Sequence, residues 1–189
     1  GLVGSEMCIR DSGEASSSWE ESADPSLSDL GNLQAEECAN KLFNLEKINT
    51  FDLISSPLNR AQATAKPLSE KIAKLVTINS HFAEIPSPGI NLSERKEWLG
   101  KIFKMKLKDL EAPQRKWKEE IISEVENLTK PTIIFSHFMV INIIVSHLTK
   151  NDFVVSFYPD NCSITTLSKN ASGKIELISI GAELQTELN

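Results

Sequence analysis

The residues best suited to chemistry in this chain centre on Arg60. An apolar run at 51–55 ends in Ser55-Ser56-Pro57, and a helical pattern follows with Arg60 in its first turn. A strand that leads into a helix start presents free backbone N–H groups and the positive end of the helix dipole. An arginine there adds a planar, permanently charged fork that grips an anion through two donors. The pattern predicts a site for an anion such as phosphate.

A histidine occupies the equivalent place after a second predicted strand. The chain has three histidines, and His137 directly follows the apolar run 132–136. Ligands of open α/β sheets collect at the carboxyl ends of strands, so His137 and Arg60 are expected to meet there. An imidazole can donate to an anionic oxygen and stabilise its charge. The alternative is a histidine that only caps a buried turn, but together with Arg60 the ligand-binding interpretation is favoured.

Glu84 offers a carboxyl group for proton transfer. It lies in the loop 81–92, HFAEIPSPGINL, which is long enough to hold functional residues. A phosphate bound nearby would raise the pKa of this carboxyl group, which suits a general acid. The alternative is a solvated loop glutamate. The neighbouring Ile85-Pro86 and the order of the motifs favour the functional interpretation.

The elements that must position these residues alternate between strands and helices. Ser28 is a candidate N-cap for the first helix, which has apolar residues at 35, 38, 39 and 42. Six apolar runs are expected to be strands: 51–55, 75–78, 132–136, 153–157, 163–167 and 174–180. This order predicts an α/β fold, a three-layer αβα sandwich with a mainly parallel sheet, helices on both faces and an antiparallel edge.

One predicted helix after the Glu84 loop carries Trp98 together with Arg95, Lys96 and Lys101. Such residues can line a lid over a site, or they can pack and solvate an ordinary surface helix. The second interpretation is favoured for this helix, although the residues that select a substrate are expected within 81–115.

Composition narrows the function classes. A length of 189 residues suits one domain, and the formal net charge of −6 argues against a general nucleic-acid binder. Cys8, Cys38 and Cys162 lie far apart, which favours reduced thiols and a cytoplasmic location over a disulfide framework or zinc site. The most apolar run, 132–148, contains serine, asparagine and histidine residues, so no membrane span is expected.

These motifs together resemble the histidine phosphatase superfamily, the phosphoglycerate-mutase-like enzymes. Ser-Pro-Leu-x-Arg-Ala-x-x-Thr-Ala around Arg60 is similar to its second signature, and Ser136-His137 to its second histidine motif. Three further segments resemble family elements in the correct order: 24–35, 83–85 and 161–164. The resemblance implies that Arg60 and His137 contact a phosphoryl group and that Glu84 protonates the leaving group. It implies a small phosphorylated substrate and neither metal nor cofactor.

The family's opening signature, Arg-His-Gly after the first strand, is incomplete. That histidine attacks phosphorus and becomes phosphorylated, which splits one displacement into two. The corresponding residues of this chain are Arg10-Asp11-Ser12-Gly13, so the nucleophilic histidine is absent. Arg10 is a candidate phosphate ligand by its position only. Asp11 as the nucleophile is a further alternative, but aspartyl-phosphate chemistry would want Mg²⁺ and more carboxylates nearby.

The first twelve residues, GLVGSEMCIRDS, resemble a translated sequencing adapter. They are too short and too acidic for a signal peptide, and they show neither helical nor strand periodicity. We therefore expect 1–12 to be an artefactual leader and 13–189 to be a single, N-terminally truncated domain. The first strand of the sheet is expected to be missing or replaced.

The sequence thus predicts a phosphomonoester hydrolase that acts through a phosphohistidine in its intact parent. This chain is expected to be inactive because the nucleophilic histidine is absent. Two alternatives stay open, a non-catalytic phosphate-binding or regulatory pseudoenzyme and a phosphotransferase of the phosphoglycerate mutase type.

Overall fold

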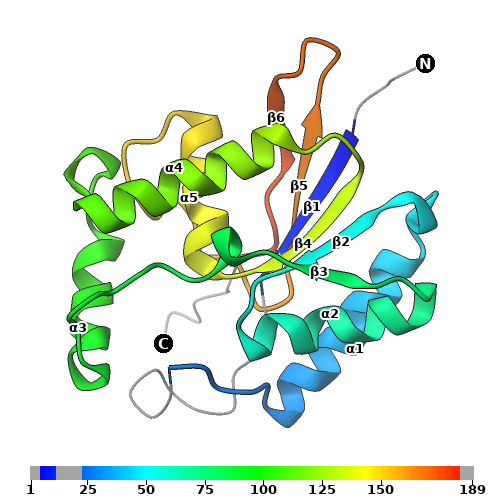
Figure 1. Ribbon diagram of the computed structural model, residues 1–189, viewed down its shortest axis with the longest axis horizontal. Coiled ribbons are helices and arrows are strands. Elements are labelled where there is room, and N and C mark those ends of the chain that lie inside the picture. The colour runs from blue at the N-terminus through cyan, green and yellow to red at the C-terminus, as the bar shows by residue number, and fades with distance from the viewer. Residues whose placement is uncertain (1–4, 12–22, 184–189) are drawn as a thin grey trace.

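The computed structural model describes the backbone of residues 5–11 and the whole of residues 23–183. The strands are β1 (Ser5–Asp11), β2 (Asp52–Ser55), β3 (Val76–Ile78), β4 (Thr132–Ser136), β5 (Ile164–Lys169) and β6 (Ile175–Ser179). The α-helices are α1 (Asp29–Phe43), α2 (Asn59–Ile72), α3 (Leu92–Phe103), α4 (Ala112–Asn127) and α5 (Phe138–Thr149). The strands form one sheet in the order β3-β2-β4-β1-β5-β6, with helices on both faces (Figure 1). The predicted α/β sandwich is confirmed.

The sheet is parallel in its first four strands and antiparallel at the other edge. β4 pairs in parallel with both β1 and β2, and β2 pairs in parallel with β3. β5 is antiparallel to β1 and to β6, so the predicted antiparallel edge is also confirmed. Parallel pairing brings the carboxyl ends of β1, β2 and β4 to one side, where Asp11 aligns with Ser136 and Ser55 with Phe135.

β1 decides one of the two alternatives expected for the first strand of the sheet, which were that it is missing or that it is replaced. Residues 5–11 form a strand despite their lack of periodicity, and this strand lies between β4 and β5. Its backbone pairs with both neighbours, which would otherwise each present a row of unpaired N–H and C=O groups inside the sheet. The position of the first strand is therefore occupied, by residues that we expected to belong to an artefactual leader, so the strand is not missing and its replacement stays a prediction.

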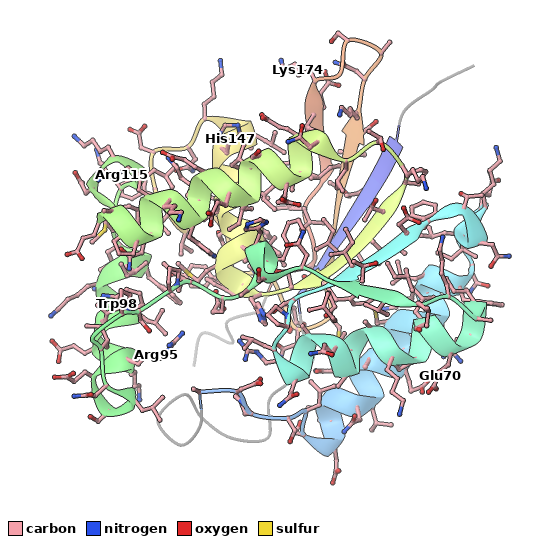
Figure 2. The ribbon with its side chains drawn as sticks, in the orientation of Figure 1. Glu70, Arg95, Trp98, Arg115, His147 and Lys174 are labelled. Carbon is pink, nitrogen blue, oxygen red and sulfur yellow. The ribbon has the colours of Figure 1, made fainter. Side chains whose placement is uncertain are left out.

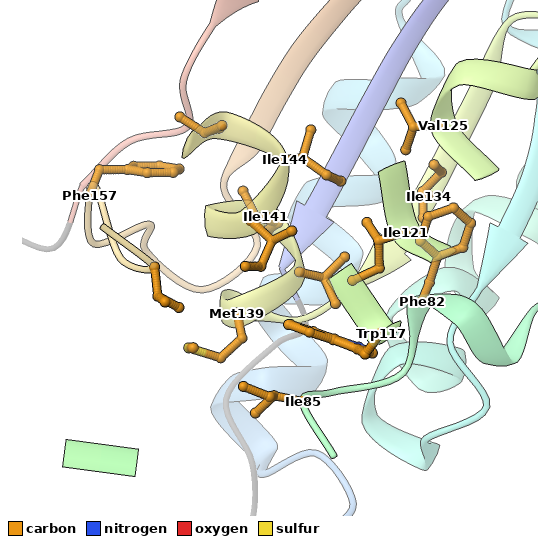
Figure 3. Packing of buried hydrophobic residues seen from close by; sticks show 14 of the residues in the cluster. Phe82, Ile85, Trp117, Ile121, Val125, Ile134, Met139, Ile141, Ile144 and Phe157 are labelled. Carbon is orange, nitrogen blue, oxygen red and sulfur yellow. The ribbon is translucent and has the colours of Figure 1, made fainter. Parts of the chain in front are cut away.

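The helices cover the sheet through two separate cores. β4 is buried along its whole length, and its alternation directs Ile134 to one face and Ile133 and Phe135 to the other. The Ile134 face packs against α4 and α5, with Trp117 and Ile121 in the cluster shown in Figure 3. The opposite face packs against α1 and α2, where Ser28 caps α1 as predicted by accepting a hydrogen bond from the Gly31 N–H at 3.0 Å.

The predicted strand at 153–157 is wrong. The carboxamide of Asn142, which is buried in α5, accepts hydrogen bonds from the N–H groups of Ser156 at 2.8 Å and Phe157 at 3.1 Å. The buried residues of the segment are Val154 and Phe157, three positions apart and not two. A side chain on the helix thus satisfies donors that a strand would direct to a neighbouring strand, and the segment packs as a loop.

None of the helices in the described ranges is long and apolar enough to cross a lipid bilayer.

Candidate active site

Arg60 lies where the sequence predicted it, in the first turn of α2 just beyond the carboxyl end of β2. Its side chain is buried, with 5% of its surface exposed. The residue before α2 is Leu58, whose apolar side chain offers no oxygen to the helix N–H groups. The N–H of Asn59, the first of α2, instead donates to Oδ1 of Asp24 at 2.8 Å, so the positive charge at this end of the helix is that of the Arg60 guanidinium.

His137 directly follows β4 and precedes α5, and it is almost completely buried at 1% exposure. Its Nε2 lies 2.7 Å from Oγ of Ser56, a serine that is itself fully buried. The Ser56 hydroxyl accepts a hydrogen bond from the N–H of Leu58 at 3.2 Å, which leaves its own proton for Nε2. This arrangement fits a neutral imidazole that is protonated on Nδ1.

Electrostatics keep His137 neutral. Burial, and after it the charge of Arg60, hold its pKa well below the usual value of 6.5. Within the described ranges, Nδ1 of His137 is buried without a hydrogen-bond partner. A buried donor without a partner costs free energy, so this atom is suited to an acceptor oxygen of a ligand.

Glu84 is buried and is not the solvated loop residue that the alternative assumed, with 8% of its surface exposed. Its Oε1 accepts a hydrogen bond from the N–H of Ile85 at 3.0 Å, and the N–H of Met139 is a second donor. Met139 belongs to the first turn of α5, so the carboxyl group lies at the positive end of that helix. Burial raises the pKa of Glu84, and Arg60, the two N–H donors and Arg95 offset part of this rise.

The loop that carries Glu84 is fixed by neighbours on both sides. The indole N–H of Trp117 donates to the carbonyl of Ala83 at 3.0 Å, and Ile85 packs beside Trp117 in the core (Figure 3). The hydroxyl of Ser136, at the end of β4, donates to the carbonyl of Phe82 at 2.8 Å. The end of β4 therefore holds both His137 and the loop of Glu84 in one place.

Arg95 is partly buried on α3, and both interpretations of this helix, as a lid and as a surface helix, stay predictions. Its Nη1 donates to Oγ of Ser87 at 2.7 Å, and Figure 2 shows the side chain extending from α3 toward the body of the protein. Burial lowers the pKa of Arg95, Glu84 raises it and Arg60 lowers it again, so the three charges lie within one electrostatic cluster. Lys101 of the same helix instead pairs with Glu97 at 2.9 Å on the exposed side.

The sequence missed Arg95 and Ser56 for different reasons. The sequence drew attention to Ser56 only as one of the residues that end the predicted strand 51–55. Its position next to the predicted anion site could have identified it as a site residue. Arg95 was considered as a residue of a lid, but the surface-helix interpretation was favoured because one arginine among the charged residues of an amphipathic helix is typical of a solvated face.

Arg10 and Asp11 lie at the carboxyl end of β1. Arg10 aligns with Phe135 and Asp11 with Ser136, so their backbone is adjacent to the residue that precedes His137. The side chains of both residues lie outside the described part of the structure, as do Ser12 and Gly13. The candidate role of Arg10 as a phosphate ligand stays a prediction.

Known proteins share both the sequence pattern and the fold. The model of the histidine phosphatase superfamily (branch 1) matches residues 13–179. A mycobacterial glucosyl-3-phosphoglycerate phosphatase is 18% identical with a TM-score of 0.70, over 95% of this chain and 100% of its own. A phosphoserine phosphatase from Entamoeba histolytica, solved with 3-phosphoglyceric acid, is 23% identical with a TM-score of 0.71, over 94% and 96%. A search of the curated proteins gave no match.

The fold is thus that of an α/β protein whose buried Arg60 and His137 lie at the carboxyl ends of its parallel strands. The match over residues 13–179 shows that the chain belongs to branch 1 of the histidine phosphatase superfamily.

Proposed function

We propose that this chain binds small phosphomonoesters at the site formed by Arg60, His137 and Glu84. The observation that carries the proposal is the convergence of these three residues at the carboxyl ends of β2 and β4. The charge of Arg60 affects the pKa of both His137 and Glu84, so the three groups are close enough to act on one ligand. The two similar proteins named above are phosphatases, which supports this class of function.

Each group has a role that follows from its surroundings. Arg60 binds two phosphoryl oxygens through its guanidinium fork. His137 is neutral in the unliganded site, and a bound phosphate dianion would favour its protonated form and so strengthen its hydrogen bond to the phosphoryl group. Glu84 carries a raised pKa, which keeps a proton available for the leaving-group oxygen.

Catalysis in this family requires a nucleophilic histidine, which we propose is the group this chain lacks. The family match begins at Gly13, and Asp11-Ser12 precede it where the signature has Arg-His. With that histidine the reaction would run in two displacements. The imidazole would attack phosphorus while the ester oxygen leaves with the proton of Glu84, and water would then attack the phosphohistidine to release phosphate. Without it, the site binds phosphomonoesters and does not turn them over.

A two-residue repair tests this mechanism. The double variant Asp11→Arg/Ser12→His restores the signature, and Asp11→Arg/Ser12→Asn is its matched control without a nucleophile. We expect the first variant to hydrolyse 4-nitrophenyl phosphate in the presence of EDTA, and the control and the unmodified chain to show no turnover. Rapid quenching should also trap acid-labile protein-bound phosphate in the first variant alone.

Other outcomes would separate the alternatives. A folded repair variant that binds phosphate but never hydrolyses the ester would favour the non-catalytic binding protein. Hydrolysis by the unmodified chain that depends on added Mg²⁺ would contradict the histidine mechanism and point to Asp11. If inorganic phosphate does not bind to any of the folded proteins, the site assignment itself is wrong.

A further inference from the structure

We propose that Gln114 and Trp117 of α4 are positioning residues for Glu84, which hold its loop at one point on each side of the carboxyl group. This inference rests on the proposed function, in which Glu84 is the proton donor. It adds to that function the residues that keep the donor in place.

The first step is the pair of hydrogen bonds that flank Glu84 in the chain. The indole N–H of Trp117 donates to the carbonyl of Ala83 at 3.0 Å. The side-chain amide of Gln114 donates to the carbonyl of Pro86 at 2.8 Å. Both α4 side chains are buried, with 3% of the surface of Gln114 and 6% of that of Trp117 exposed. A buried donor is costly to leave without an acceptor, so both contacts hold the loop against the helix.

The second step is the match between the loop and one face of α4. The two donors are three residues apart in the helix, and the two carbonyl groups that they bind are three residues apart in the loop. Glu124 lies seven residues after Trp117 and so on the same face of the helix. Its carboxylate accepts a hydrogen bond from the side chain of Asn79 at 2.9 Å and lies 2.9 Å from Nδ1 of His81. The loop therefore runs antiparallel to α4 and contacts it repeatedly between residues 79 and 86.

The third step is the need of this loop for contacts from outside. Residues 83–91, all of which the structure describes, form neither helix nor strand, so no ladder of backbone hydrogen bonds fixes them. A proton donor must be held within about 0.5 Å of its productive position, and a misplacement of about 1 Å can cost about 100-fold in rate. The hydroxyl of Ser136 holds the loop before Glu84, at the carbonyl of Phe82, and Gln114 holds it after Glu84.

A titration of the Glu84 carboxyl group by ¹³C NMR tests this inference in the unmodified chain without any need for turnover, with Glu84→Gln to assign the resonance. Burial is the largest cause of the raised pKa of Glu84. Gln114→Met keeps the length of the side chain and removes the donor. We expect the loop to loosen, water to reach the carboxyl group, and the pKa of Glu84 to fall toward its ordinary value. Trp117→Phe should shift it in the same direction.

The control is Ile48→Val, in the core on the opposite face of the sheet. It should lower the stability of the protein and leave the pKa of Glu84 as in the unmodified chain. If this pKa is the same in the unmodified chain, in Gln114→Met and in Trp117→Phe, the two hydrogen bonds do not position the carboxyl group and the inference is wrong.

The leaving-group dependence of the rate is a second measurement, in the repaired variant Asp11→Arg/Ser12→His. Phenyl phosphate has a poorer leaving group than 4-nitrophenyl phosphate and depends more on a proton donor. Adding Gln114→Met should lower kcat/KM about 10-fold for phenyl phosphate and much less for 4-nitrophenyl phosphate. The affinity for inorganic phosphate should stay unchanged.

The affinity for inorganic phosphate separates the remaining outcomes. If Gln114→Met weakens phosphate binding by as large a factor as it lowers kcat/KM for phenyl phosphate, the contact supports the whole site and the inference is again wrong. Failure of inorganic phosphate to bind to the unmodified chain would instead overturn the proposed function.

Discussion

The contact between Ser56 and His137 makes the sharpest prediction, through the substitution Ser56→Ala. The Ser56 hydroxyl is fully buried and joins Nε2 of His137 at 2.7 Å to the N–H of Leu58 at 3.2 Å. Its removal leaves a buried imidazole nitrogen without a partner, which costs about 1–3 kcal/mol. We expect the free energy of unfolding to fall by that amount, and phosphate binding to weaken because the ring of His137 loses its orientation.

The matched control is the neighbouring Ser55→Ala. Ser55 is also fully buried, but its hydroxyl donates to the carbonyl of Ser56 at 2.9 Å, and a carbonyl can accept a hydrogen bond from other donors. Loss of this ordinary hydrogen bond is expected to cost about 0.5–1.5 kcal/mol and to leave His137 undisturbed.

The assay combines urea unfolding with ¹⁵N NMR of the imidazole groups and a titration with inorganic phosphate. Ser56→Ala should shift the Nε2 resonance of His137 and weaken phosphate binding, and Ser55→Ala should do neither. If both variants lose equal stability and the His137 resonances match those of the unmodified chain in each, the hydroxyl does not orient this ring and the reasoning is refuted.

Four further predictions concern charge, backbone strain and packing. Burial raises the pKa of Glu84 in the fold, so its ionised form destabilises the protein at neutral pH, and Glu84→Gln should raise the urea midpoint at pH 7 but not at acidic pH where the carboxyl group is protonated. The pKa of His137 is lowered in the folded protein, so as the pH falls below 6.5 this imidazole is protonated in the unfolded chain before it is protonated in the folded one, and the protein loses stability. This loss should be smaller in His137→Asn, and urea denaturation at several pH values between 5 and 7 would measure it. Lys150 ends α5 with φ of 55°, and Lys150→Gly should add about 1 kcal/mol, or about 2–4 °C in Tm, whereas Lys150→Ala should add nothing. Ile121 is fully buried between α4 and the sheet, and Ile121→Ala should lower the free energy of unfolding by about 2–5 kcal/mol; a loss below 1 kcal/mol would contradict the packing.

The sequence by itself determined the elements and residues whose signals are local. Apolar runs of strand length predicted β2 and β4, and the polar residues just after them led to Arg60 and His137. Ser28 was identifiable as an N-cap because capping depends on residues within one helical turn. The order of motifs was enough to predict the superfamily, which the match over residues 13–179 confirms.

Only the tertiary structure decided features that depend on partners distant in the chain. Residues 5–11 become a strand because β4 and β5 both need hydrogen-bond partners, and residues 153–157 do not because Asn142 satisfies their N–H groups first. The burial of Glu84 at the start of α5, and the approach of Arg95 to it, follow from the packing of a loop and a helix against strands far along the chain. The periodicity of a sequence shows which face of a helix or strand is apolar. It does not show which charged side chain on the polar face will lie close to a charged side chain of another element.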